Sequence, residues 1–181
     1  MANGAARQLV LFRHAKSAGP DVADHERPLA RRGRRDAPVA GRWLRAAGLV
    51  PDRVVCSTAR RARQTWQLAA GELDSSPAVS FDHRVYETSA GELLDLARET
   101  APGTRRLLIV GHDPAMQELT TALASGRVGD PGALDRVRVK FPTAAIAVLE
   151  FTGTWQELRP GQARLTAFVI PRDLRSGTAG R

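Results

Sequence analysis

Residues 8–14 of the chain read Gln-Leu-Val-Leu-Phe-Arg-His, and this stretch decides how the remainder is interpreted. Its uninterrupted apolar run predicts a short buried β-strand over residues 8–12. Two polar residues, Arg13 and His14, follow where that strand ends. In open α/β sheets, ligands bind beyond the carboxyl ends of the strands. The stretch therefore predicts a core strand, followed by residues that form part of a binding site.

Strands and helices are expected to alternate along most of the chain. The expected strands are 8–12, 52–56, 78–82, 106–110, 144–151 and 164–170, and the expected helices are 30–47, 59–70, 90–99 and one capped by Asp113 with Pro114 at its first position. This alternation favours an α/β fold with a mostly parallel sheet. No repeat or linker divides the chain, so we expect one domain over residues 1–174 and a disordered tail over residues 175–181.

Polar clusters follow three of the expected strands. Arg13-His14 follows strand 8–12, Ser57 follows strand 52–56, and Gly111-His112 follows strand 106–110. Because ligands sit at the carboxyl ends of parallel strands, we expect these clusters to converge on one site.

The composition is that of a single globular domain. The chain has 181 residues, of which 43% are hydrophobic and 25% charged. No apolar run approaches the roughly 20 residues that span a bilayer, and the N-terminus lacks the apolar region of a secretory signal. A cytoplasmic location is therefore expected. Cys56 is the only cysteine, so no internal disulfide can form.

The chain is strongly basic, with a formal net charge of +8. Lys16 and Lys140 are the only lysines among its 27 basic residues, so the other 25 are arginines. Arginine's planar fork suits phosphate groups, and the excess favours anionic partners. Biased genomic composition is the alternative explanation. A non-enzymatic polyanion binder is a further alternative, but the chain has no recognised nucleic-acid motif and few aromatic residues for stacking.

The two strand-end histidines suggest phosphoryl chemistry. His14 lies between Arg13 and Lys16, and nearby positive charge disfavours protonation of an imidazole. A neutral imidazole can attack phosphorus at neutral pH. His112 could then donate hydrogen bonds to the phosphoryl oxygens. A metal pair is the rival explanation, but no short paired ligand spacing and no cysteine cluster support it.

Arg60, Arg61 and Arg63 begin the helix that follows Ser57. They could simply form a solvated helix face. One of them could instead reach back to the strand ends, where its fork would bind two phosphate oxygens at once.

Five blocks of this sequence together resemble the histidine phosphatase superfamily, which includes the phosphoglycerate mutases, and they are most similar to its SixA-type phosphohistidine phosphatases. The blocks are Leu11-Phe12-Arg13-His14-Ala15-Lys16-Ser17, Arg27-Pro28-Leu29 with Gly33, the stretch from Cys56 to Thr65, Tyr86-Glu87, and Val110-Gly111-His112-Asp113-Pro114. Their order and spacing agree over about residues 8–125. The resemblance implies a three-layer α/β/α sandwich like that of the phosphoglycerate mutases.

The resemblance also implies roles for individual residues. His14 would be the nucleophile that becomes phosphorylated, and Arg13, Arg61 and His112 would complete the phosphate pocket. Ser17 would be a further phosphate contact, and Glu87 is the candidate proton donor. No metal or organic cofactor is implied.

The chain departs from the family pattern in two ways. Many relatives carry asparagine six residues after the nucleophilic histidine, whereas this chain has Pro20, which has no side-chain donor. The chain is also short for a phosphoglycerate mutase, which weakens that reading. We expect a phosphatase with a phospho-His14 intermediate, acting on protein phosphohistidine or, alternatively, on a small metabolite or nucleotide. We expect no membrane partner and no specific nucleic acid, and the sequence leaves the oligomeric state open.

Overall fold

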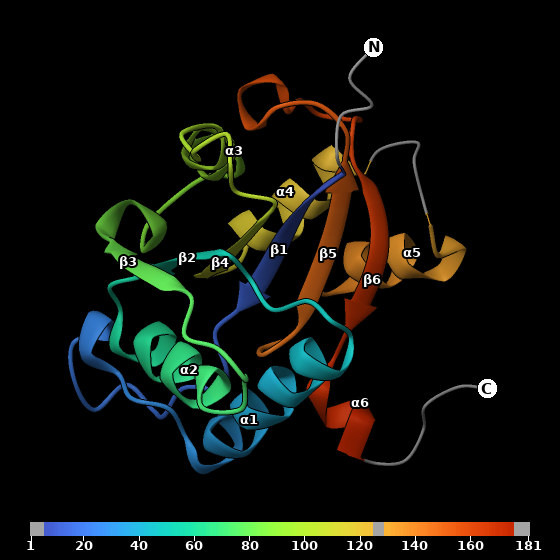
Figure 1. Ribbon diagram of the computed structural model, residues 1–181. Coiled ribbons are helices and arrows are strands. Elements are labelled where there is room, and N and C mark those ends of the chain that lie inside the picture. The colour runs from blue at the N-terminus through green and yellow to red at the C-terminus, as the bar shows by residue number, and fades with distance from the viewer. Residues whose placement is uncertain (1–5, 125–128, 176–181) are drawn as a thin grey trace.

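A six-stranded sheet forms the centre of the computed structural model, which describes residues 6–124 and 129–175 (Figure 1). The strands lie in the order β3-β2-β4-β1-β5-β6. The neighbouring pairs β3–β2, β2–β4 and β4–β1 are parallel. Strand β5 is antiparallel to both β1 and β6. Their bounds are Arg7–Arg13 (β1), Arg53–Ser57 (β2), Ala78–Asp82 (β3), Arg106–Gly111 (β4), Ile146–Phe151 (β5) and Arg164–Val169 (β6).

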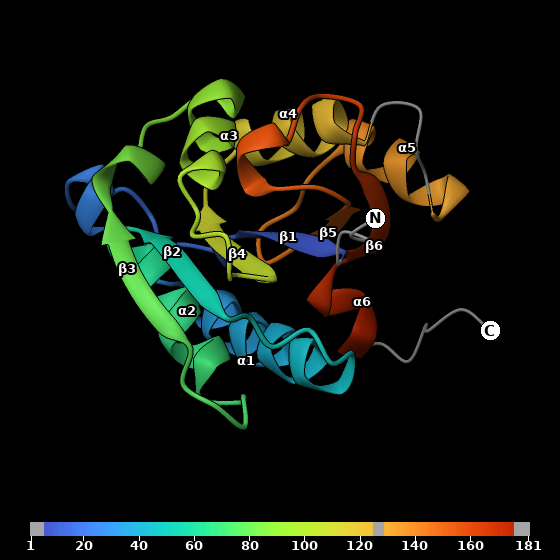
Figure 2. The ribbon, with the colours of Figure 1, turned by 45° about the horizontal axis from the view of Figure 1, so that its top comes forward.

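Helices cover both faces of this sheet, as Figure 2 shows. Helices α1 and α2 pack on one face around an apolar cluster that includes Phe12 and Trp66. Helices α3, α4 and α5 pack on the other around a cluster that includes Leu93 and Met116. The helices are α1 (Arg31–Ala46), α2 (Arg60–Ala70), α3 (Ala90–Arg98), α4 (Ala115–Leu123), α5 (Pro131–Val139) and α6 (Pro171–Arg175), with short 3-10 helices η1 (Asp24–Glu26), η2 (His83–Val85) and η3 (Trp155–Glu157). The single-domain, three-layer α/β/α fold is confirmed.

Two expectations about local structure are wrong. Asp113 does not cap α4, which begins at Ala115 after Pro114 without a side-chain cap. The N-cap position is occupied by Pro114, and the carboxylate of Asp113 pairs with the guanidinium of Arg13 at 3.2 Å. The tail does not begin at residue 175, because Arg175 ends α6 and pairs with the buried Asp36 at 2.8 Å. Residues 176–181 lie outside the described residues.

The loop after β1 is fixed by the close approach of α1. A Cβ atom on Gly33 would lie 2.2 Å from the carbonyl oxygen of Lys16, two residues beyond His14. The loop is also held by Thr65 of α2, whose hydroxyl accepts the N–H of Ala15 at 2.9 Å. The conformation of the segment around His14 therefore depends on both helices of this face.

Replacing Gly33 by alanine is expected to lower both stability and activity, because backbone rather than a flexible side chain blocks the added methyl group. Overpacking costs about 1–3 kcal/mol, which for a domain of this size lowers Tm by several degrees. Thermal unfolding and turnover of nitrophenyl phosphate measure the two effects. Gly103→Ala is the control, since nothing lies within 4 Å of its added Cβ. Unchanged Tm and turnover in Gly33→Ala would contradict this packing.

Within residues 6–124 and 129–175, no helix is long and apolar enough to cross a membrane.

Candidate active site

The carboxyl ends of β1, β2 and β4 bring the three predicted polar clusters together. Arg13 of β1 is paired in register with Gly111 of β4, and the N–H of His14 donates to the Gly111 carbonyl at 3.0 Å. Ser57 ends the neighbouring strand β2. His14 and His112 are each 8% exposed, and Ser57 is fully buried. These clusters meet as the sequence predicts.

The imidazole of His14 is held in one orientation and one tautomer. Its Nδ1 lies 2.8 Å from the carbonyl oxygen of Ala15. A carbonyl oxygen can only accept, so Nδ1 must carry the proton. The lone pair therefore resides on Nε2, the ring atom that can act as a nucleophile.

Burial, followed by the charges of His112, Arg61 and Arg13, lowers the pKa of His14 to about 3, although the hydrogen bond to Ala15 opposes this shift. Both desolvation and nearby positive charge disfavour the imidazolium form. At neutral pH the ring is neutral and its Nε2 lone pair is available.

His112 faces His14, with 5.0 Å between the ring centroids. Its Nε2 lies 2.8 Å from Ser57 Oγ, and its Nδ1 lies 3.5 Å from Arg61 Nη2. Because a guanidinium can only donate, Nδ1 is the acceptor and Nε2–H donates to Ser57. Burial, followed by the charge of Arg61, lowers the pKa of His112 to about 4. Ser57 is thus a positioning residue for His112, a role that was not predicted from the sequence.

Arg61 is the arginine of α2 that reaches the strand ends. It is 7% exposed, whereas Arg60 and Arg63 are exposed on the same helix. Its Nη1 donates to the backbone carbonyl of Asp24 at 2.6 Å, and its Nη2 lies 3.0 Å from the Asp24 carboxylate. The guanidinium is therefore fixed in place beside His112.

Arg13 approaches the same point from the end of β1. Its Nη1 donates to the carbonyl oxygen of Phe141 at 2.6 Å and pairs with Asp113. Burial raises the pKa of the Asp113 carboxyl, and the charge of Arg13 opposes this shift. Because Arg13 contributes to the lowered pKa values of both His14 and His112, its positive charge acts on both rings.

Asp24 is a site residue that was not predicted from the sequence. Its carboxylate accepts the Tyr86 hydroxyl at 2.6 Å and an Arg27 N–H at 3.0 Å, in addition to Arg61. The hydrogen bond from Tyr86, followed by those from Arg27 and Arg61, holds the pKa of Asp24 below its usual range. An anionic group thus already lies on the buried arginine. The available signal was the position of Asp24, three residues before the Arg-Pro-Leu block.

The model of the histidine phosphatase superfamily (branch 1) matches residues 9–105, a segment that contains both His14 and Arg61. The chain belongs to this superfamily. His112 lies beyond the matched segment, and the structure places it against His14.

Similar sequences and structures are consistent with membership of this superfamily. An uncharacterized protein of Mycobacterium tuberculosis (strain H37Rv) is 45% identical over 162 residues, which cover 89% of this chain and all of that protein. A Nakamurella multipartitia protein assigned as phosphohistidine phosphatase SixA is 37% identical, with a TM-score of 0.80 over 92% of this chain and 98% of that one. The protein histidine phosphatase SixA complexed with tungstate has a TM-score of 0.72 at 22% identity, covering 92% and 99% of the two chains, and shares the fold. This chain is a phosphatase.

Two predicted site residues of this phosphatase lie outside the buried cluster. Ser17 is half-buried, and its hydroxyl accepts a hydrogen bond from Arg27 Nη2 at 2.9 Å. Glu87 is exposed and lines a hollow of about 460 Å³ with His83, Arg84, Glu92 and Asp95. Its neighbour Tyr86 lies against His112, with 5.6 Å between the ring centroids. The structure thus groups Glu87 with that hollow, and its role as proton donor stays a prediction.

No group of three or more histidine, cysteine, aspartate or glutamate residues is placed to hold a metal ion in the part of the phosphatase that the structure describes.

The two site histidines are expected to titrate far below the ordinary histidine pKa of 6.5, near 3 for His14 and 4 for His112. The ring resonances of both should therefore stay constant from pH 8 to pH 5 in an NMR titration. Between pH 6.5 and these values the unfolded chain binds protons that the buried rings do not, so the free energy of unfolding falls as the pH is lowered through this range. Single His14→Gln and His112→Gln variants assign the signals. A midpoint near 6.5 for either ring would contradict this environment.

Proposed function

We propose that this phosphatase removes the phosphoryl group from phosphohistidine in proteins, through a covalent intermediate on Nε2 of His14. The observation that carries the mechanism is the bond from His14 Nδ1 to the Ala15 carbonyl, which directs the lone pair to Nε2. The substrate class is supported by the Nakamurella protein assigned as phosphohistidine phosphatase SixA, which is 37% identical to this chain.

The first step transfers the phosphoryl group between two imidazoles. The Nε2 lone pair of His14 attacks phosphorus, and the phosphorus–nitrogen bond of the substrate breaks. When the other ring nitrogen of the substrate carries a proton, the substrate leaves as neutral imidazole and needs no proton from the enzyme. Arg61 and Arg13 supply positive charge for the phosphoryl oxygens, which is where most catalysis of phosphoryl transfer originates.

The second step hydrolyses the intermediate. Because His14 keeps its proton on Nδ1, hydrogen-bonded to Ala15, the phosphorylated ring is the imidazolium form and a good leaving group. Water attacks phosphorus, the bond to Nε2 breaks, and dihydrogen phosphate leaves. His14 is then regenerated as the neutral ring with which the cycle began.

A pair of peptides with one sequence tests the substrate class. One peptide carries phosphohistidine and the other carries phosphoserine at the same position. The proposal expects kcat/KM to be at least about 10²-fold higher for the phosphohistidine peptide, since a serine alkoxide is a much poorer leaving group than imidazole and depends on a proton from a general acid. Equal rates, or a preference for phosphoserine, would favour the alternative of a phosphomonoesterase.

Glu87→Gln tests the candidate proton donor. An alkyl phosphate has a poor leaving group, whereas nitrophenolate and imidazole leave with little help. We expect the substitution to slow alkyl phosphates strongly while sparing nitrophenyl phosphate and phosphohistidine. The ratio of kcat/KM values removes uniform losses in binding. Glu92→Gln, in the same hollow, is the matched control. A uniform decrease on all three substrates would exclude Glu87 as the acid.

A further inference from the structure

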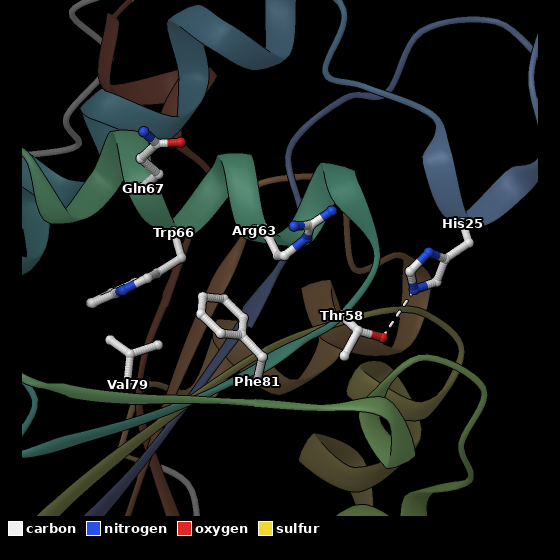
Figure 3. A pocket seen from close by; sticks show the side chains of 7 residues that line it. All are labelled: His25, Thr58, Arg63, Trp66, Gln67, Val79 and Phe81. Carbon is white, nitrogen blue, oxygen red and sulfur yellow. Dashed lines mark hydrogen bonds between the residues drawn. The ribbon is translucent and has the colours of Figure 1, made fainter.

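An apolar groove lies between α2 and the strand β3 (Figure 3). It has a volume of about 730 Å³. Trp66, Arg63 and Gln67 line it from α2, and Val79 and Phe81 line it from β3. In Figure 3 the side chains of Val79 and Phe81 point from the strand toward the helix.

The strand side of this groove exposes large apolar side chains. Phe81 is 55% exposed and Val79 is 38% exposed. Within residues 6–124 and 129–175, β3 pairs with β2 alone and is an edge strand of the sheet. Exposed apolar residues beside an unpaired strand edge form a surface suited to a polypeptide. The phosphoryl chemistry at His14 gives no reason for them.

A row of neighbouring aromatic rings leads from one end of the groove to the phosphoryl site. His25 lines the groove there, and its Nε2 lies 2.9 Å from the hydroxyl of Thr58. The ring of His25 meets the ring of Tyr86 edge-on at 4.8 Å, and Tyr86 lies 5.6 Å from His112. His112 is in turn 5.0 Å from His14. A ligand that reaches both His14 and Phe81 must therefore be extended, which fits a peptide segment better than a small phosphate ester.

The wall of the groove that α2 supplies is positively charged. Arg63 lines the groove and is exposed, and Arg60 is exposed one turn earlier on the same helix. The hydrogen bond with His25, followed by the weaker influence of the charges of Arg63 and Arg60, lowers the pKa of the exposed Glu26 carboxyl. Together with the net charge of +8, this favours a partner that carries acidic side chains next to apolar ones.

We propose that this groove binds the segment of a substrate protein that flanks its phosphohistidine. An apolar side chain of that segment packs on the exposed Phe81 and Val79, and an acidic side chain pairs with Arg63. The groove thereby selects among phosphohistidine proteins, while the buried cluster performs the transfer. This inference rests on the proposed function, and it makes Phe81 and Arg63 determinants of specificity rather than of chemistry.

Three substrates separate docking from chemistry. The first is free phosphohistidine. The other two are short peptides phosphorylated with phosphoramidate on their single histidine, one continuing with leucine and glutamate and the other with serine and lysine. For the wild type we expect kcat/KM to be at least about tenfold higher for the leucine–glutamate peptide than for the serine–lysine peptide. Equal values for the two peptides would overturn the proposal.

Phe81→Ser and Arg63→Glu are expected to remove this preference. For the leucine–glutamate peptide we expect KM to rise about tenfold in each variant, with kcat retained. Free phosphohistidine, which is too short to reach the groove, should be hydrolysed at the wild-type rate. Val139→Ser, at an 85% exposed position on α5, is the matched control and should change neither substrate. Thermal unfolding checks that each variant is folded.

The outcomes distinguish this inference from the proposed function. Failure of the wild type to hydrolyse any phosphohistidine would contradict the proposed function. Hydrolysis of all three substrates with no effect of Phe81→Ser or Arg63→Glu would overturn the inference about the groove and leave the proposed function intact. Sedimentation of the wild type as a dimer that Phe81→Ser converts to a monomer would assign the groove to a second copy of the chain, which also overturns the proposal.

Discussion

Replacement of His14 by alanine is expected to reduce kcat/KM for nitrophenyl phosphate by at least about 10³-fold, because removing a nucleophile removes the covalent route entirely. The structure gives His14 a neutral ring, a fixed tautomer and a buried position at the end of β1. No other group in the buried cluster combines these properties. His112 is also neutral, but both of its ring nitrogens are engaged, one by Ser57 and one by Arg61.

The same substitution at an exposed histidine is the control. His83 lies in η2 and is exposed, so His83→Ala should retain nearly full activity on nitrophenyl phosphate. Circular dichroism checks that His14→Ala keeps the fold. Retention of more than a few per cent of the wild-type activity by folded His14→Ala would show that His14 is not the nucleophile.

Arg61→Ala is expected to lower kcat/KM about 10³-fold or more, whereas Arg63→Ala should have little effect on small substrates. Removing one arginine that binds the oxygens of a transferring phosphoryl group lowers the rate by about that factor. The two arginines differ by two positions in α2, but Arg61 is buried beside His112 and Arg63 is exposed in the groove. The pair is therefore matched in chemistry and differs in position.

Removal of Arg61 also leaves the charge of Asp24 unbalanced. When Arg61 is removed, Asp24 keeps its hydrogen bonds from Tyr86 and Arg27. Its negative charge then lies near the phosphoryl site without the arginine that balanced it, which adds to the loss. Arg61→Lys restores the charge but not the two-pronged geometry and should recover only part of the activity. Equal losses in Arg61→Ala and Arg63→Ala would contradict the assignment of Arg61.

The sequence alone predicts the layers of the fold and the centre of the site. Residues 8–12 and 106–110 are identifiable because strands buried on both faces are apolar throughout, and β1 and β4 occupy the middle of the sheet. His14 and His112 are identifiable because each follows such a strand. The antiparallel direction of β5 and β6 and the helix α5 were not predicted, since strand periodicity contains no direction and α5 has a weak apolar pattern.

Contacts between distant loops could not be predicted in the same way. Asp24 contacts Arg61 and Tyr86, which are distant in the sequence, and its position before the Arg-Pro-Leu block does not by itself predict those partners. Asp113 looked like a helix cap from its place before Pro114, but the long-range attraction of Arg13 determines its partner. Local pattern therefore predicts elements and strand ends, whereas ion pairs across loops require the three-dimensional structure.

The central claim is that the phosphoryl group passes through Nε2 of His14, and trapping the intermediate tests it most directly. The wild type is mixed with labelled substrate, quenched in alkali within milliseconds, and digested for mass spectrometry, because phosphohistidine survives base. We expect label on the peptide that contains His14, attached at Nε2, and none in His14→Ala. Label on another residue, or rapid turnover with no label on the protein, would contradict the claim.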